Sequence, residues 1–263
     1  MNWPLLIVIA AFLSIAMAAA FTVQRVTGSS GWIDTIWSAS VGIGGVAVAI
    51  FADDTDMRGL AVLALVVVWS LRLGSHIGFR TKGGGEDPRY AALLDEWGES
   101  ASMRLFVFLQ IQAVAAFVLV LAVHLAAANP AEFPRLIDML AILLAIAALV
   151  GEAVADAQLS RFRKTPQAKG AVCEIGLWRY SRHPNYFFEW LFWCSFPLLA
   201  LNAQPLSWLS IAAPVMMYWL LVHVSGIPPL EDHMLRSRGD AFRQLQNRVN
   251  AFFPGPRKTG GRS

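Results

Sequence analysis

Charge and cysteine are both scarce in this 263-residue sequence. Charged residues make up 15 % of it, against roughly a quarter in soluble domains, while 56 % is hydrophobic and the mean hydropathy is +0.52. These values exclude an ordinary soluble domain and predict an integral membrane protein. Of the two cysteines, Cys173 falls in a loop and Cys194 in an apolar run. A disulfide is therefore not expected, and since neither has metal-ligand spacing, no metal site is predicted.

The signatures of soluble nucleotide-binding folds are also missing. The sequence has no internal repeat, no low-complexity tract and no G-x-G-x-x-G fingerprint. The Gly83-Gly84-Gly85 triplet lacks the Lys-Ser/Thr pair of a phosphate-binding loop, so it predicts a flexible turn. No Lys or Arg precedes the first apolar run, which is longer than the roughly 7–15 residues of a secretory signal. We therefore expect the first run to be a retained helix.

Long apolar runs, by contrast, are abundant. A bilayer core about 30 Å thick needs about 20 apolar residues per helical crossing. The sequence therefore predicts an all-α, polytopic membrane protein with seven transmembrane helices, as a single membrane-embedded domain over residues 1–263. The expected spans are about 3–22, 33–51, 60–79, 105–128, 137–157, 186–202 and 207–225, followed by a polar tail over 227–263.

The distribution of cations predicts the orientation. The loops 22–32, 80–104 and 158–185 and the tail hold 18 of the 21 Lys and Arg residues. Because short cytoplasmic loops carry the excess of Lys and Arg, we expect the N-terminus outside and the C-terminus in the cytoplasm. This rule also accounts for the net charge of +3 without a nucleic-acid partner.

A basic loop runs into the start of an apolar helix at Pro184. Proline is tolerated in a first helical turn, where backbone N–H groups have no helical partner. Those N–H groups and the helix dipole favour anions, so the loop predicts a polyanion site, with phosphates as the expected guests. The cations of this loop are Arg161, Arg163, Lys164, Lys169, Arg179 and Arg182.

Ionisable and polar residues inside the apolar runs gather near the predicted cytoplasmic side. Charges are costly in a bilayer, so each is a functional hypothesis. Steps of three and four residues put Trp69, Arg72 and His76 on one helical face. Two interpretations stay open: the groups pair and hold helices together, or they line a polar cavity, with Trp37 and Trp69 inside it. The other members are Asp34, Gln110, Gln112, Glu152, Asp156, Asn185 and Glu189.

The tail carries apolar residues at steps near three and four, with cations between them. It is either an amphipathic helix on the lipid headgroups or a flap over the basic loop. In the second interpretation Arg236, Arg238 or Arg243 adds phosphate contacts.

Several motifs resemble one enzyme family. The runs Gly176–Tyr180 and Arg182–Tyr186 with Glu189 resemble the C-terminal signature of the steroid 5α-reductase and sterol reductase superfamily. Together with Gly85–Tyr90, GEDPRY, and the chain length, they resemble its bacterial branch. The resemblance implies an NADPH-dependent enzyme of the bacterial inner membrane, with its active site facing the cytoplasm. A similar Arg-His-Pro-x-Tyr stretch occurs in isoprenylcysteine and phospholipid methyltransferases, which bind S-adenosylmethionine.

The resemblance also implies roles for individual residues. Asp34 matches the catalytic carboxyl residue, and Trp69 stands where the steroid enzymes have a tyrosine, beside the matching Arg72. Expected catalytic residues are Asp34, Trp69, Arg72 and His76, and expected substrate contacts are Asp34, Trp37, Trp69 and Glu189. Expected NADPH contacts are Asp156, Arg163, Lys164, Arg179, Tyr180, Arg182, His183, Asn185, Tyr186, Glu189, Glu231 and Arg236.

The expected reaction is reduction of a carbon–carbon double bond conjugated to a ketone in a lipophilic, steroid-like substrate that enters from the bilayer. Donors must face the oxygen on which charge develops. A protonated Asp34 is expected to supply one donor. The second is expected from Arg72, His76 or the indole N–H of Trp37 or Trp69. The alternative enzyme is a lipid or isoprenylcysteine methyltransferase. A transporter would need broken helices and repeated halves, and neither is visible. Membrane lipid is an expected partner, and the protein is expected to be a monomer or weak oligomer.

Overall fold

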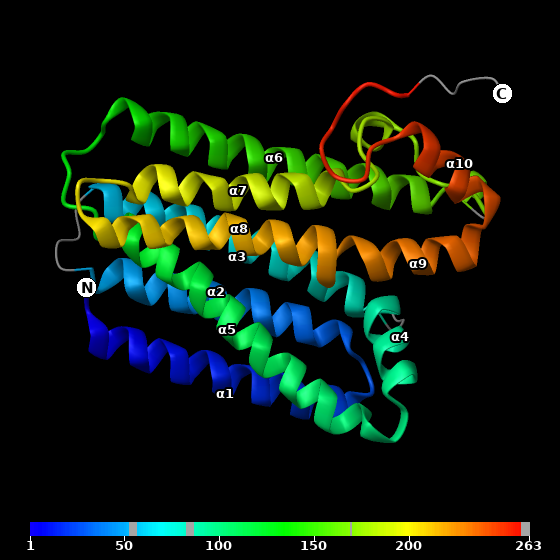
Figure 1. The fold of residues 1–263 in the computed structure, drawn as a ribbon, viewed down its shortest axis with the longest axis horizontal. Helices are drawn as coiled ribbons and strands as arrows, with labels where there is room; N and C mark the ends of the chain where they lie inside the picture. The colour runs from blue at the N-terminus through cyan, green and yellow to red at the C-terminus, as the bar shows by residue number, and fades with distance from the viewer. Residues whose placement is uncertain (53–56, 83–86, 169, 259–263) are drawn as a thin grey trace. The chain divides into compact units, whose positions relative to one another are not determined.

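Helices account for the regular structure of this chain. A computed structural model describes residues 1–52, 57–82, 87–168 and 170–258, and these contain no β-strand. The Gly83–Gly85 triplet and Lys169 lie outside the described residues. The α-helices in Figure 1 are α1 (Trp3–Thr27), α2 (Gly31–Ile50), α3 (Met57–Lys82), α4 (Pro88–Trp97), α5 (Ala101–Ala127), α6 (Leu136–Arg163), α7 (Pro184–Ala200), α8 (Ala212–Trp219), α9 (Ile227–Arg238) and α10 (Asp240–Arg248).

Shorter helical turns connect them. The 3-10 turns are η1 (Gly98–Ser100), η2 (Pro166–Ala168), η3 (Gly176–Arg179) and η4 (Pro205–Ile211), and a π-helical turn, η5 (Leu220–Val224), continues α8. The predicted span 207–225 is therefore built from 3-10, α and π segments rather than from one regular helix.

The described chain contains six helical segments long and apolar enough to cross a membrane. This confirms that the protein is an integral membrane protein. The remaining predicted span corresponds to α7, which has 17 residues, at the lower end of the length that crosses a bilayer. The count of seven and the orientation of the termini stay predictions. The six segments are Trp3–Thr27, Gly31–Ile50, Met57–Lys82, Arg89–Ala127, Leu136–Arg163 and Pro205–Arg238.

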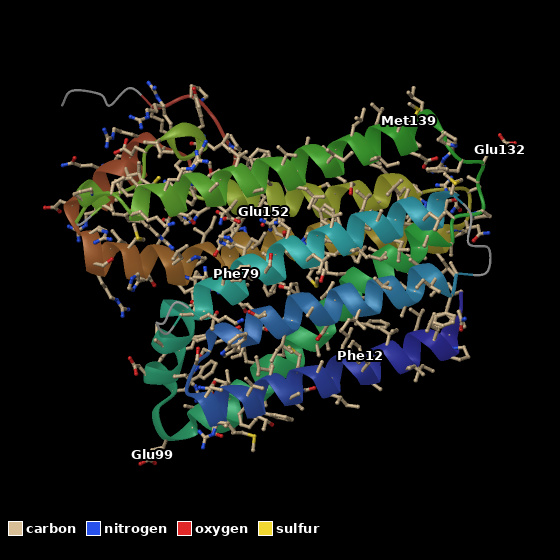
Figure 2. All side chains as sticks on the ribbon, turned by 180° about the vertical axis from the view of Figure 1, so that it is seen from behind. Phe12, Phe79, Glu99, Glu132, Met139 and Glu152 are labelled. Carbon is tan, nitrogen blue, oxygen red and sulfur yellow. The ribbon has the colours of Figure 1, made fainter. Side chains whose placement is uncertain are left out.

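Large apolar side chains lie on the outer surfaces of these helices. Figure 2 shows Met139 projecting from α6, and 52 % of this residue is exposed. Ile7 of α1 and Leu71 of α3 are exposed to a similar degree. Such surface is unfavourable in water but suits contact with lipid chains, which agrees with the membrane assignment.

The internal contacts divide the chain into two compact units. Unit 1 comprises Met1–Leu143 and Trp193–Met216, and unit 2 comprises Leu144–Phe192 and Met217–Ser263. In unit 1, α2 packs against α1, α3 and α5. A Cβ atom on Gly42 would lie 2.1 Å from Oγ of Ser70. Glycine thus permits the close approach of α2 to α3, as small residues do between membrane helices.

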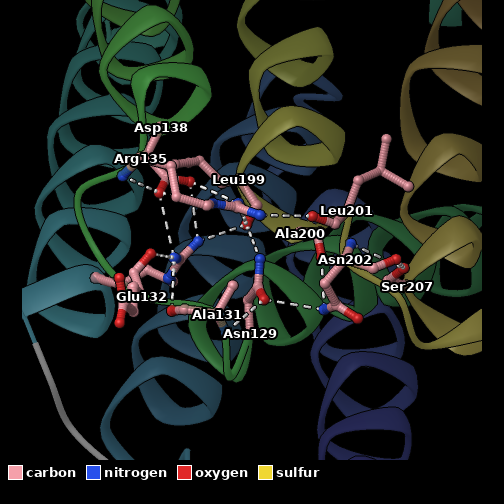
Figure 3. Close-up of polar contacts among 11 residues, drawn as sticks. Asn129, Ala131, Glu132, Arg135, Asp138, Leu199, Ala200, Leu201, Asn202 and Ser207 are labelled. Carbon is pink, nitrogen blue, oxygen red and sulfur yellow. Dashed lines mark hydrogen bonds and ion pairs between the residues drawn. The ribbon is translucent and has the colours of Figure 1, made fainter.

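One end of unit 1 is held by a buried polar network (Figure 3). Arg58 of α3 is fully buried, and its guanidinium pairs with both oxygens of Asp138 at 2.9 and 3.2 Å. The same guanidinium donates to the backbone carbonyls of Ala131, Glu132 and Leu199 at 3.0, 2.8 and 3.0 Å. Because a buried charge is costly unless it is paired and hydrogen-bonded, these contacts explain how an arginine fits here.

Neighbouring side chains extend this network. Arg135 pairs with Asp138 at 2.8 Å and donates to the carbonyl of Leu201 at 3.0 Å. Asn202 donates to the side chain of Asn129 at 2.9 Å. The loop between α5 and α6 and the chain after α7 are therefore joined through side chains.

In unit 2, the C-terminal helices form a hairpin. The turn between α9 and α10 is at Gly239, whose φ of 51° favours glycine. The apolar face of α10 is buried, with Phe242, Leu245 and Val249 packed against Val172, Met234 and Leu235. This packing favours the flap interpretation of the tail over a helix lying on headgroups.

Candidate functional site

A carboxylate and a tyrosine hydroxyl meet in unit 1. Asp34 lies in the first turn of α2, and Tyr90 lies in α4. The Tyr90 hydroxyl donates to Oδ1 of Asp34 over 2.8 Å, and Arg89 pairs with Oδ2 of the same carboxylate. Tyr90 is 3 % exposed, whereas the Asp34 side chain is 20 % exposed. The hydroxyl is therefore shielded from water while the carboxylate stays partly accessible.

Asp87 holds the arginine of this pair. Its Oδ1 accepts from Nε of Arg89 at 3.0 Å and its Oδ2 accepts from Nη2 at 2.9 Å, a two-point contact. Arg80 at the end of α3 adds a third donor at 3.1 Å. Burial alone would raise the pKa of Asp87, but the hydrogen bonds and charge of Arg89 and the charge of Arg80 outweigh it, so the pKa lies below its ordinary value.

Gln112 of α5 completes the surroundings of the hydroxyl. Its Nε2 donates to the oxygen of Tyr90 at 3.1 Å, and its backbone carbonyl accepts from Nε1 of Trp37 at 3.1 Å. The ring of Tyr90 meets Phe108 edge-on, with centroids 6.3 Å apart. We call Asp34, Asp87, Arg89, Tyr90 and Gln112 the Asp34 cluster.

The residues predicted on α3 are positioned by aromatic packing. Trp69 is completely buried, and its ring meets Trp37 and Trp193 edge-on with centroids 6.4 and 5.0 Å apart. Arg72 and His76 are half-buried one and two turns further along α3. Trp37 thus links the Asp34 cluster to Trp69, while the catalytic roles of Trp69, Arg72 and His76 stay predictions.

The sequence does not predict that Tyr90 and Arg89 contact Asp34. Both belong to the GEDPRY run, but that run lies in a polar connection with no periodicity that reaches Asp34, more than 50 residues earlier. The contact depends on how α4 folds back beside the start of α2. The usable signal is the combination of a tyrosine, an arginine and a helix-capping aspartate next to a proline.

In unit 2, three residues predicted to contact the cofactor also bind one another. Arg182 donates to both carboxylate oxygens of Glu231, at 2.7 and 3.1 Å, and Nε2 of His183 lies 2.9 Å from Oε1. Gln246 donates to Oε2 at 2.8 Å. These contacts fasten the basic loop to α9 and α10. Their atoms have a structural task, and a role in cofactor binding stays a prediction.

The environment of His183 favours its neutral form. Burial lowers the pKa of His183, and the hydrogen bond and charge of Glu231, which act in the opposite direction, do not restore it. The ring stacks on Tyr186, with centroids 5.6 Å apart and planes 13° from parallel. A neutral imidazole that donates to a carboxylate fits this arrangement.

Asn185 and Asp156, both expected to contact NADPH, lie in contact with each other. The side-chain amide of Asn185, in the first turn of α7, donates to Oδ1 of Asp156 on α6 at 3.3 Å. Asp156 and Glu189 are both buried. Close packing of Phe188 on Gly151, where a Cβ would lie 2.4 Å from the ring, holds α7 beside α6.

The predicted cations divide into two groups. Arg182 is engaged within the protein, as described above. Others are exposed on the surface of unit 2 near the start of the loop, at η3 and on α9. The exposed ones are Arg161, Arg163, Lys164, Arg179 and Arg236.

The chain after α10 lies across the basic loop. The backbone N–H of Arg182 donates to the carbonyl of Asn250 at 2.9 Å, and that of Gly255 donates to the carbonyl of Tyr180 at 3.0 Å. Arg257 pairs with Glu174 at 2.6 Å. We call residues 249–258 the C-terminal strap. It fixes the backbone of the loop and leaves Tyr180 about half exposed.

Comparisons with known proteins support a family but name no activity. The family described as "Protein of unknown function (DUF1295)" matches residues 20–249. An uncharacterized protein of Schizosaccharomyces pombe is 39 % identical over 83 residues, which are 30 % of this chain and 22 % of that protein. The chain thus spans about a fifth of the length of this curated relative. No solved structure matches the chain.

Proposed function

This chain belongs to the family described as DUF1295, and we propose that it is an NADPH-dependent reductase in the membrane. Its reaction is reduction of a carbon–carbon double bond conjugated to a ketone in a lipophilic, steroid-like substrate. The proposal places the protein in the steroid 5α-reductase superfamily that its motifs resemble. The proposal assigns the substrate to the Asp34 cluster of unit 1 and the cofactor to Asn185, Asp156 and the exposed cations of unit 2.

The observation that carries the proposal is the hydrogen bond from the buried Tyr90 hydroxyl to Asp34. Reduction of an enone needs an acid beside the carbonyl oxygen, because negative charge develops there. A tyrosine hydroxyl shielded from water can act as this acid. A methyltransferase transfers a methyl group to a nucleophile and has no need for a carbonyl acid.

The residues of the cluster then have distinct tasks. When substrate binds, the Tyr90 hydroxyl turns from Asp34 to the carbonyl oxygen and donates its proton there. The resulting enol becomes the saturated ketone when the α-carbon takes a proton from solvent and the enol proton returns to the Tyr90 phenolate. Gln112 orients the hydroxyl by donating to its oxygen. Arg89 offsets the charge of Asp34, which would otherwise repel the developing oxyanion. Since Asp34 accepts from two donors, Tyr90 replaces it as proton donor in this proposal.

The residues of unit 2 fit the expected cofactor. Exposed guanidinium groups such as Arg163 and Arg179 suit phosphate oxygens. Asn185 carries both a donor and an acceptor, as recognition of a carboxamide requires. The chemistry that NADPH supplies when bound is transfer of a hydride to the carbon β to the carbonyl. Asp156 orients Asn185, and the C-terminal strap holds the loop that presents the cations.

The finer topology is part of this proposal. It has seven spans, with α7 as the short one, an outside N-terminus and a cytoplasmic C-terminus, as the cation distribution predicts. The site then faces the cytoplasm of a bacterial inner membrane, where NADPH is available. The substrate enters from the lipid, and the protein is a monomer or weak oligomer.

Binding and turnover together test this function. The purified protein is melted with NADPH, NADH and S-adenosylmethionine, since a ligand that binds the folded state raises its melting temperature. We expect the largest rise with NADPH and oxidation of NADPH that depends on a 3-oxo-Δ4-steroid. Asn185→Ala and Arg163→Ala should weaken the NADPH shift. Asp34→Ala should keep it and lower turnover, because the Tyr90 hydroxyl loses the acceptor that positions it. A shift with S-adenosylmethionine alone would favour the methyltransferase.

A further inference from the structure

Asp87 lies where α3 passes into α4, and its carboxylate contacts both sides of that junction. Its side chain is 8 % exposed. Oδ1 accepts from the backbone N–H of Arg89 at 3.0 Å, which caps α4, and also from Nε of the same residue. Oδ2 accepts from Nη2 of Arg89 and from Arg80. One buried carboxylate therefore joins α3, the first turn of α4 and a guanidinium.

This arrangement sets the orientation of Arg89 toward the site. A two-point contact between carboxylate and guanidinium fixes the plane of the guanidinium. The Nη2 atom held by Asp87 is the same atom that pairs with Asp34. Tyr90 follows Arg89 directly in the first turn of α4, so the cap at Asp87 also fixes where that turn begins. The contacts of Asp87 described here are with Arg80 and Arg89, so Asp87 acts on Asp34 and Tyr90 through Arg89.

We infer that Asp87 is a positioning residue for the proposed reaction: it holds Arg89 against Asp34 and the Tyr90 hydroxyl in line for proton donation. This inference rests on the proposed function for its effect on turnover. Its structural part, that Asp87 keeps Arg89 and Tyr90 in place, does not depend on which reaction the protein carries out.

Asp87→Asn separates positioning from helix capping. Asparagine caps a helix about as well as aspartate, so the backbone contact to Arg89 is kept. Its amide offers one oxygen and turns an NH2 group toward the guanidinium, so the two-point contact is lost. Asp87→Glu restores the charge, and Arg80→Gln is the matched control, because it removes the outer, partly exposed partner of the same carboxylate.

Steady-state kinetics with a 3-oxo-Δ4-steroid and NADPH give the first readout. In Asp87→Asn we expect kcat to fall by about 10- to 100-fold, since small misplacements of reacting groups have effects of this size. Both KM values should change less than about threefold, because neither substrate touches Asp87 in the proposal. Asp87→Glu should recover most of kcat, and Arg80→Gln should change it less than about twofold.

Nitration of Tyr90 by tetranitromethane, measured by mass spectrometry of the peptide, gives a readout that needs no activity. The buried ring should react slowly in the wild type and in Arg80→Gln, and roughly fivefold faster in Asp87→Asn, because reactivity follows local opening. Melting curves identify any variant that does not fold. If Asp87→Asn does not fold, the kcat and the nitration rate of Asp87→Glu are compared with the wild type in its place.

The two readouts test the proposed function and the positioning role of Asp87 separately. A wild type without enone-dependent NADPH oxidation refutes the proposed function, and faster nitration in Asp87→Asn would still support positioning. Unchanged kcat together with unchanged nitration in Asp87→Asn overturns the inference. A rise in KM at constant kcat overturns it as well, since that pattern belongs to a binding residue.

Discussion

The Tyr90 hydroxyl combines three properties at the scale of one residue. It is buried, it donates to a carboxylate at 2.8 Å, and it accepts from the amide of Gln112 at 3.1 Å. Tyr90→Phe removes the oxygen and keeps the ring that packs on Phe108. We expect kcat for enone reduction to fall by about 100- to 10,000-fold, the usual contribution of a positioned acid. Steady-state assays of NADPH oxidation measure this.

The control for this prediction is Tyr218→Phe in unit 2, where the ring packs among Trp190, Phe252 and Phe253. We expect kcat near the wild-type value. The NADPH-dependent rise in melting temperature should be kept in both variants. Full turnover in Tyr90→Phe would remove Tyr90 as proton donor.

Single residues could be predicted from the sequence only where a local motif carried them. Asp34, Asn185 and Asp156 stand out as polar residues in or beside apolar runs, the resemblance assigns them roles, and the structure brings Asn185 to Asp156. Long-range partners were missed for a physical reason. Arg182 and Glu231 are 49 residues apart, and no local pattern states that two polar segments will meet. Tyr90 and Asp34 meet in the same way, through tertiary folding.

At the scale of elements, the C-terminal strap depends on one aromatic anchor. Phe252 is 4 % exposed, and its ring contacts Phe187, Trp190 and Tyr218 edge-on. Phe252→Ala leaves a cavity among these rings. We expect a loss of about 3–5 kcal/mol in the free energy of unfolding, as for other buried phenylalanines. Thermal unfolding in detergent measures it, and limited proteolysis should show cleavage of the strap.

Phe253→Ala is the matched control, because Phe253 contacts the same ring group but is 49 % exposed. Its effect on unfolding should be clearly smaller. Equal effects of the two variants would show that Phe252 does not anchor the strap.

Element positions follow closely from apolar runs. The expected span 33–51 corresponds to α2 and 60–79 to α3, each within a few residues, because a run of apolar residues bounded by polar ones fixes a membrane helix. The segment 207–225 was expected as one helix. Pro205 and Pro214 lie in or beside it, and the structure uses 3-10, α and π turns there. Helix type within an apolar run depends on such local constraints, which hydropathy does not contain.

The pH dependence of stability belongs to the whole molecule, since unfolding is measured globally. The pKa of His183 is lower in the folded protein than in the unfolded chain, where it is near its ordinary value of about 6.5. Between these two values the unfolded state binds more protons, so stability falls as the pH falls. Above about pH 6.5 the folded protein has the full stabilisation from the neutral His183. Below the folded pKa no further stability is lost through this residue. The melting temperature should therefore drop as the pH falls below about 6.5.

His183→Gln should reduce that drop, because glutamine does not titrate and can still donate to Glu231. The control is His233→Gln, at an exposed position on α9, which should leave the slope unchanged. Identical slopes in wild type and His183→Gln would rule out His183 as the source.

The contribution of Arg58 to stability depends on the complete fold, because its partners come from distant parts of the sequence. Arg58 and Arg135 both fall in the loops between the expected spans. The structure buries Arg58 completely and surrounds it with Asp138 and three backbone carbonyls, two from the loop before α6 and one from the end of α7. Arg58→Met removes the donor of the Ala131 and Glu132 carbonyls and leaves the buried Asp138 carboxylate with Arg135 as its remaining cation. Breaking a buried pair in this way costs about 3–5 kcal/mol, so we expect a large fall in melting temperature in detergent.

Arg135→Gln tests whether the destabilisation expected in Arg58→Met comes from the burial of Arg58 or from the loss of a positive charge alone. Arg135 pairs with the same Asp138, but its side chain is 26 % exposed, so water can replace part of what it loses. If burial decides the effect, Arg135→Gln should destabilise much less than Arg58→Met, although both variants remove one positive charge. A melting temperature within about 2 °C of wild type in Arg58→Met would contradict this argument. It would mean that Asp138 and the carbonyls find other donors, and that this end of unit 1 is not held by Arg58.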